Sequence, residues 1–103
     1  MTKFNDMKDI GLIIREVRKR RKITQGDLCE SSGLSQTYLS QIEGGTRSPA
    51  IKSLNLISGA LHIPLPVLMF ITLEEADIDP EKVKSYRELK PAIDALIKEF
   101  FLQ

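Results

Sequence analysis

The stretch TQGDLCESSGLSQTYLSQIEGGTR, residues 24–47, predicts two short helices joined by a tight turn. Thr24 can cap the first helix, because its hydroxyl can accept a hydrogen bond from a backbone N–H of the first turn. Asp27 follows three residues later, where a negative charge favours the positive end of a helix. Gly33 suits the turn, since glycine adopts a positive φ without steric cost. Ser35 is the expected cap of the second helix.

The outward face of the second helix, residues 35–44, is uncharged. Leu39 and Ile42 lie three residues apart and predict a buried stripe. The opposite side carries the hydroxyl and amide side chains of Thr37, Ser40 and Gln41 together with Gly44, and the Gln36 amide is exposed at the first turn. Such groups donate and accept hydrogen bonds, which suits the reading of base edges in a DNA major groove. A Ser/Gln-rich solvent face is the alternative, and this helix alone does not decide between the two interpretations.

An amphipathic helix precedes this stretch. Its apolar residues recur at helical spacing and predict one buried stripe, made of Ile10, Ile13, Ile14 and Val17. The basic run 18–22 at its end favours the negative end of a helix and can also attract phosphates. Residues 1–8 show no periodicity and are expected to form a mobile tail, with Asp9 as the first cap.

Two further helices are expected after Pro49. The first is expected to be mostly buried through Ile51, Leu54, Leu56, Ile57, Ala60 and Leu61. Ala50 is a weak cap for this helix, and His62 is its expected terminator. The second begins at the prolines of residues 64–66 and presents dense apolar surface.

The C-terminal segment, residues 72–103, begins with an acidic connector and continues as helices. Asp79 followed by proline marks a helix start, and Pro91 is expected to kink or restart the helix because it lacks an amide N–H. An apolar stripe then consists of Ile93, Leu96, Ile97, Phe100 and Phe101. This stripe can pack on its own chain or on a second copy. We favour dimerisation, since DNA-binding proteins of this kind usually bind the duplex as dimers.

Length and composition indicate a small globular protein. The chain has 103 residues, of which 42% are hydrophobic, enough for a modest core. One cysteine and one histidine exclude an internal disulfide and a multi-cysteine metal site, so we expect no metal and no cofactor. No apolar run approaches the roughly 20 residues that span a bilayer, and the polar start is not a secretory signal. We expect a cytoplasmic protein with no membrane partner.

The charge is divided unevenly along the chain. Residues 1–61 hold ten Lys/Arg against six Asp/Glu, a balance of +4. Residues 62–103 hold five Lys/Arg against eight Asp/Glu, a balance of −3. A basic front half suits a module that faces a polyanion, although a split of this size can also arise by chance.

The segment ITQGDL…SGLSQTYLSQIEGGTRSP…L…LISGALHIPL resembles the XRE/Cro-type helix-turn-helix family, which has the lambda-repressor-like fold. The match covers residues 10–70, and its combination of spacings is highly specific. The matching positions are Gln25, Leu28, Gly33, Leu34, Ser35, Tyr38, Leu39, Ser40, Ile42, Glu43, Gly45, Arg47, Pro49, Leu54, Ala60 and Leu61. The resemblance implies an all-α fold, with a five-helix DNA-binding domain over residues 9–71 and a C-terminal helical dimerisation segment over residues 72–103.

The site residues follow from this resemblance and from side-chain chemistry. The resemblance implies a structural ion pair between Arg18 and Glu43. We expect base contacts from Gln36, Thr37 and Gln41, because amides can bridge adenine and a threonine methyl can meet thymine. We expect phosphate contacts from Gln25, Tyr38, Ser40, Gly45, Thr46 and Arg47. The Tyr38 hydroxyl is expected at a phosphate or in water.

These features favour a sequence-specific DNA-binding transcriptional regulator, a repressor or controller of a bacterium or its phage. It would bind an inverted-repeat operator in the nucleoid as a homodimer, with residues 35–44 in the major groove. The alternative is an antitoxin-like module whose C-terminal segment binds a cognate protein. An enzyme is not expected, since neither paired carboxylates on a predicted site nor a phosphate-cradling glycine motif is found in the sequence.

Overall fold

The computed structural model describes residues 10–102, and every regular element within that range is helical. The helices are α1 Ile10–Arg20, α2 Gln25–Ser32, α3 Gln36–Glu43, α4 Ile51–Leu61, α5 Leu65–Ile71 and α6 Val83–Ile97. Short 3₁₀ turns at Glu75–Asp77 and Pro80–Lys82 precede α6, and a π-helical turn, Lys98–Leu102, follows it. The expected all-α fold is confirmed. The expected tail, residues 1–8, and the cap at Asp9 lie outside the described residues.

Local chemistry sets the bounds of α2 and α3 as the sequence predicts. The Asp27 N–H donates to Thr24 Oγ1 at 3.0 Å, and the Thr24 N–H donates to Asp27 Oδ2 at 3.1 Å. These reciprocal bonds form a capping box, and they lower the pKa of the Asp27 carboxyl. Gly33 ends α2 with φ of 79°, and Ser35 Oγ accepts the Tyr38 N–H at 3.1 Å at the start of α3. The short segment 24–43 is therefore fixed by its own residues.

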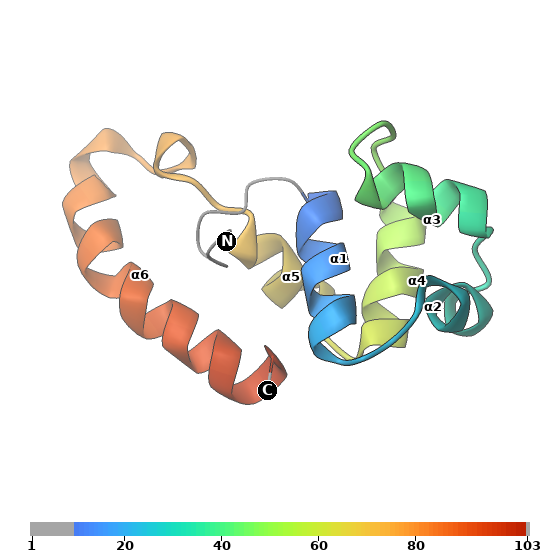
Figure 1. Ribbon diagram of the computed structural model, residues 1–103. Helices are drawn as coiled ribbons and strands as arrows, with labels where there is room; N and C mark the ends of the chain where they lie inside the picture. Colours follow the sequence, from blue (N-terminus) through green and yellow to red (C-terminus); the bar gives the residue numbers. More distant parts are fainter. Residues whose placement is uncertain (1–9, 103) are drawn as a thin grey trace.

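Helices α1 to α5 enclose one apolar core. Figure 1 shows these five helices packed together, with α6 lying along one side. The apolar residues with 0% exposure come from all five helices and are Ile13, Ile14, Val17, Leu28, Leu39, Ile57, Leu61 and Leu68. The buried face of α3 therefore rests on the same core as α1, and the opposite face of α3 is left outward.

Helix α4 is less buried than the sequence predicts. Leu54, Ile57 and Leu61 face the core, but Ile51 is 64% exposed and Leu56 is 43% exposed. Leu56 lies two residues beyond Leu54, a rotation of about 200° around the helix, which turns it to solvent. Ile51 occupies the first turn, beyond the edge of the core. The predicted terminator is confirmed, because the residue after Leu61, His62, adopts a left-handed conformation with φ of 58°.

Pro91 neither ends nor restarts the C-terminal helix, so the expectation of a restart at this proline is wrong. Helix α6 is assigned without interruption from Val83 to Ile97, and Figure 1 draws it as one continuous coil. Proline removes the donor that would meet the Arg87 carbonyl four residues earlier. Both Pro91 and Arg87 are exposed, so water can satisfy that carbonyl and the helix continues.

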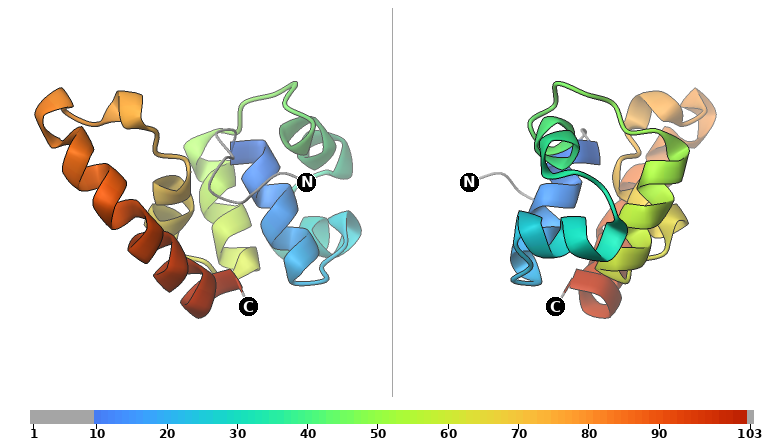
Figure 2. Two further views of the ribbon diagram at one scale, coloured as in Figure 1. Left: turned by 60° about the vertical axis from the view of Figure 1, so that its left-hand side comes forward. Right: turned by 90° about the vertical axis from the view of Figure 1, so that its right-hand side faces the viewer.

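The C-terminal segment folds back on its own chain. Ile97 and Leu102 join the core at 8% and 4% exposure, and Ile93 and Phe101 pack against it. The Arg21 guanidinium donates to the Phe101 carbonyl, and the Tyr86 hydroxyl donates to the Leu73 carbonyl at 3.2 Å. Figure 2 shows the C-terminal end of α6 close to the five-helix core and the other end standing away from it.

This packing bears on which residues of the predicted dimerisation stripe are free to meet a second copy. All three of Ile93, Ile97 and Phe101 were expected to meet a second copy. In the structure Ile97 is buried in its own chain, and Ile93 and Phe101 are half-buried against the same core. Leu96 and Phe100 remain 54% and 69% exposed. The physical reason is that the apolar residues of this segment are distributed around more than one side of the helix, so one side can bury while another stays free.

Candidate nucleic-acid interface

The outer face of α3 presents the side chains that the sequence predicts. Leu39 and Ile42 are 0% and 1% exposed and anchor the inner face. Gln36, Thr37 and Ser40 are exposed, and Gln41 is half-buried. Amide and hydroxyl groups therefore cover a rigid, capped helix whose other side is held by the core.

A buried ion pair locks α3 to α1. Arg18 Nε lies 2.9 Å from Glu43 Oε2, and Arg18 Nη2 lies 2.9 Å from Glu43 Oε1. Arg18 Nη1 also donates to the Ile23 carbonyl at 2.9 Å. The exposed fractions are 9% for Arg18 and 3% for Glu43, so this two-pronged pair is shielded from water. The ion pair implied by the family resemblance is confirmed.

Gln25 connects this ion pair to the surface of α3. Its Nε2 donates to Glu43 Oε1 at 3.1 Å, and its Oε1 accepts from Ser40 Oγ at 3.0 Å. Both Gln25 and Ser40 were expected to contact phosphate, and the structure bonds them to each other. The sequence offers no direct signal for this contact, because the two residues lie on different helices.

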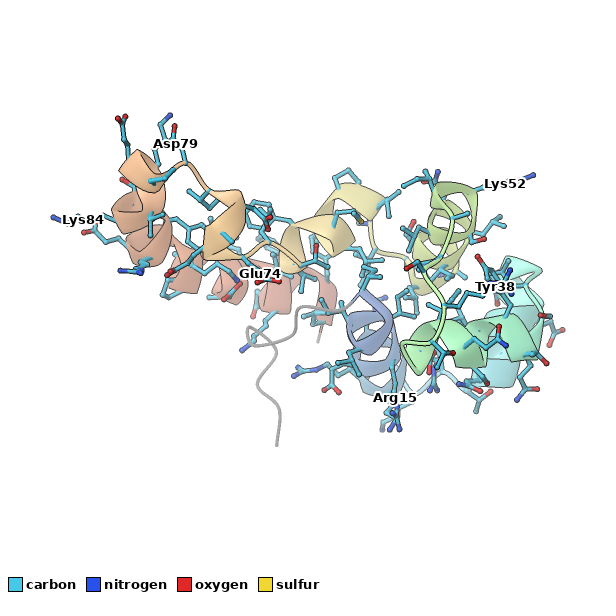
Figure 3. All side chains as sticks on the ribbon, turned by 90° about the horizontal axis from the view of Figure 1, so that it is seen from above. Arg15, Tyr38, Lys52, Glu74, Asp79 and Lys84 are labelled. Carbon is cyan, nitrogen blue, oxygen red and sulfur yellow. The ribbon has the colours of Figure 1, made fainter. Side chains whose placement is uncertain are left out.

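Tyr38 joins α3 to the start of α4. Its hydroxyl donates to Ser53 Oγ at 3.1 Å and accepts the Ala50 N–H at 3.3 Å. These hydrogen bonds lower the pKa of the Tyr38 hydroxyl, the bond to Ser53 most of all. The Tyr38 hydroxyl, expected at a phosphate or in water, thus has two partners within the protein, and its contact with DNA stays a prediction. Figure 3 shows the labelled Tyr38 beside α4.

The loop after α3 folds back on the end of that helix. The Gly45 N–H donates to the Ile42 carbonyl at 3.1 Å, and the Thr46 N–H donates to the Gln41 carbonyl at 3.0 Å. The Thr46 hydroxyl donates to the same Gln41 carbonyl at 3.3 Å. The amides of Gly45 and Thr46, which were expected to bind phosphate, thus already have acceptors at the helix end. Gly45 makes the turn possible with φ of 78°.

Arg47 completes the loop and remains exposed. Its guanidinium carbon lies 5.0 Å from the centroid of the Tyr38 ring, a cation–π arrangement. Its Nη1 lies 3.5 Å from Gln41 Oε1. A further positive charge beside α3 comes from α1, where Figure 3 shows the labelled Arg15 pointing away from the core.

The described residues give little support to a reactive thiol, a metal site or a membrane span. Burial raises the pKa of the Cys29 thiol, so the thiol stays protonated and weakly nucleophilic near neutral pH. Among residues 10–102, no three His, Cys, Asp or Glu side chains are grouped as metal ligands. Within the same range, no single helix is both long and apolar enough to cross a bilayer, although the bent pair α4 and α5 passes on length and composition together.

Comparison with known proteins assigns this sequence to a family. A family model described as helix-turn-helix matches residues 14–68, more than half of the chain. The chain belongs to the helix-turn-helix family, of XRE/Cro type. Members of this family are DNA-binding regulators rather than enzymes, so the expectation of a non-enzyme is confirmed.

Individual relatives of this helix-turn-helix protein come from phages and bacteria. The immunity repressor protein of Bacillus phage phi105 is 33% identical over 79 residues, which make up 73% of this chain and 55% of the repressor. The ImmF control region 10 kDa protein of the same phage is 33% identical over 69 residues, or 67% of this chain and 77% of the relative. The transcriptional regulator SlrR of Bacillus subtilis is 40% identical over 60 residues, or 57% and 40% of the two chains. The chain thus spans about half of the length of the immunity repressor.

Proposed function

We propose that this helix-turn-helix protein is a sequence-specific transcriptional regulator that lays α3 in the DNA major groove. The proposal depends on one observation: the outer face of α3 carries exposed Gln36, Thr37 and Ser40, while its inner face is fixed by the core and by the ion pair to α1. A fixed helix places its side chains in one register, which direct readout of bases requires. The names of its relatives, among them an immunity repressor, support repression as the outcome. The protein would act in the cytoplasm, on the nucleoid.

The proposed contacts with DNA fall into two groups, those with bases and those with phosphates. Gln36, Thr37 and Gln41 are the proposed base readers. For phosphate we favour Arg47 and the first turn of α2, where the N–H groups of Gln25 and Gly26 have no acceptor within the helix. We give less weight to phosphate contacts from three residues that the sequence suggested, Tyr38, Gly45 and Thr46. Their hydrogen-bond donors already have acceptors within the protein. Ser40 would approach the duplex as a small side chain held by Gln25.

The proposal predicts a specific cost for Gln36→Ala. Binding to the cognate site should weaken by about 1–3 kcal/mol, because a base contact is lost, while binding to random duplex stays nearly unchanged. Sites are first selected from a random duplex library, and the affinities are then measured by fluorescence anisotropy. Asn55→Ala is the matched control, since Asn55 is an exposed amide on α4. An equal loss on random duplex would reject the base-reading role of Gln36.

We further propose that the protein binds an inverted repeat as a homodimer, through an apolar stripe on α6 and the turn after it. Leu89 and Leu96 of α6 are 58% and 54% exposed, and Phe100 of the π-helical turn after α6 is 69% exposed. Their intervals of seven and four residues place them along one side of this C-terminal segment. A two-fold axis at this stripe would pair identical apolar surfaces and bury residues that solvent disfavours. The symmetry predicts half-sites about 34 Å apart, or one helical turn of DNA.

The double replacement Leu96→Glu with Phe100→Glu should convert the dimer to a monomer, because charges would face each other across the stripe. Sedimentation velocity measures the mass, and far-UV circular dichroism checks that the helices remain. Leu56→Glu is the control, since Leu56 is similarly exposed but lies on α4. A wild-type monomer at tens of micromolar would reject the dimer. A wild-type monomer that co-purifies with a second protein, lost in the double variant, would support the antitoxin-like alternative instead.

A further inference from the structure

Arg47 contacts two side chains of α3 at once. The guanidinium carbon lies 5.0 Å from the Tyr38 ring centroid, and Nη1 lies 3.5 Å from Gln41 Oε1. A separation of 3.5 Å is long for a hydrogen bond. The ring contact, however, holds the guanidinium beside the Gln41 amide without depending on that bond, since a cation over an aromatic face is attracted by the ring itself.

The Tyr38 ring is in turn fixed by α4. Its hydroxyl donates to Ser53 Oγ at 3.1 Å and accepts the Ala50 N–H at 3.3 Å, so both ends of the side chain are held. A phenol ring has only two rotatable bonds, and two hydrogen bonds at its tip restrict both of them. Arg47 therefore rests on a ring that is held by α3, by Ser53 of α4 and by the Ala50 N–H at the start of α4.

The position of Arg47 determines which way the Gln41 amide faces. The Gln41 oxygen lies toward the guanidinium. The flipped amide would place an NH₂ donor against a group that carries five N–H donors and no acceptor, which is unfavourable. The Gln41 backbone carbonyl also has a partner, because it accepts a hydrogen bond from the Thr46 N–H at 3.0 Å. The NH₂ group is thus the end of Gln41 that faces away from the guanidinium, while Oε1 keeps one lone pair beside it.

We propose that Arg47, seated on Tyr38, is a positioning residue that makes Gln41 read DNA as a hydrogen-bond donor. This inference rests on the proposed function. Guanine presents two acceptors in the major groove, N7 and O6, whereas adenine presents an acceptor beside an amino donor. Gln41 therefore favours guanine over adenine, because an adenine amino group would have to share Oε1 with the guanidinium. Arg47 retains other N–H donors for a phosphate, so both roles are compatible.

The test compares four proteins on one operator: wild type, Gln41→Ala, Arg47→Lys and the double variant. The operator comes from library selection, and the position read by Gln41 is the one whose preference disappears in Gln41→Ala. Wild type should prefer guanine there. Arg47→Lys keeps the charge but loses the planar stack, so the preference for guanine over adenine should fall about tenfold. The salt dependence of binding should match wild type, because the charge is retained.

One expected outcome and three contrary outcomes decide the inference. In the Gln41→Ala background, Arg47→Lys should cause no further change at that position, while the preference at the Gln36 position and the melting temperature stay as in wild type. If Arg47→Lys keeps the guanine preference, or weakens the Gln36 position equally, Arg47 does not position Gln41 and the inference is overturned. If wild type prefers adenine at the Gln41 position, the donor reading is wrong although the protein is still a specific regulator. If wild type prefers no duplex at all, the proposed function fails together with this inference.

Discussion

Glu43→Ala should lower the free energy of unfolding by about 3–5 kcal/mol. Arg18 and Glu43 face each other in two hydrogen bonds of 2.9 Å at 9% and 3% exposure. Removal of the carboxylate leaves the guanidinium buried without its counter-charge, and that loss of solvation is costly. The Gln25 amide also loses the acceptor of its 3.1 Å bond. Urea unfolding followed by circular dichroism measures the change.

An exposed ion pair on α1 provides the matched control. Arg20 Nε lies 3.2 Å from Glu16 Oε1, and the two side chains are 38% and 35% exposed. Glu16→Ala should cost less than about 1 kcal/mol, because exposed pairs are screened by water and salt. If Glu43→Ala costs no more than Glu16→Ala, burial of the Arg18–Glu43 pair does not stabilise the contact between α1 and α3.

A double replacement separates the net value of the pair from the cost of leaving one charge alone. Arg18→Met combined with Glu43→Leu should recover much of the stability lost in Glu43→Ala, because two apolar side chains of similar volume fill the same space. Specific DNA binding should not recover equally, since Gln25 no longer has its acceptor near α3. Recovery of both would indicate that the ion pair serves stability alone.

The motif could be predicted from the sequence because its determinants are local. The capping box of Thr24 and Asp27, the positive φ of Gly33 and the cap at Ser35 each depend on residues within three positions. The pair of Arg18 and Glu43 is separated by 25 residues. Only the family resemblance indicated it, because no local pattern states which distant charges will meet.

The polar contacts around α3 could not be predicted. Tyr38 with Ser53, Gln25 with Ser40, and Arg47 over Tyr38 all depend on how two elements cross and on the rotamers of long side chains. Their residue types gave reasonable candidates for DNA contacts, but the donors of several are used inside the protein. A list of polar residues on a helix face therefore predicts the interface better than it predicts the role of each residue.

Helix periodicity predicted which apolar residues are buried. The prediction failed where a helix extends beyond the core. Periodicity identified Ile13, Ile14 and Val17 correctly, because α1 crosses the centre of the core. It also assigned Leu56 to the core, although its angle around α4 points outward. In α6 periodicity correctly indicated apolar surface but not its partner, since packing on the same chain and pairing with a copy require the same residues.

Leu54→Ala should lower the free energy of unfolding by about 2–5 kcal/mol, whereas Leu56→Ala should change it by less than about 1 kcal/mol. Leu54 is 4% exposed and Leu56 is 43% exposed, on the same helix and two residues apart. Truncation of Leu54 removes buried methyl groups and leaves a cavity, while truncation of Leu56 changes a surface that water already reaches. Chemical unfolding of both variants in one buffer measures the difference, and helix propensity cancels because both changes are leucine to alanine within α4. Equal losses would mean that Leu56 is buried in solution, by a second copy or by another face of the chain. The Leu56 variant should also retain operator binding, since this residue lies outside α3 and its loop.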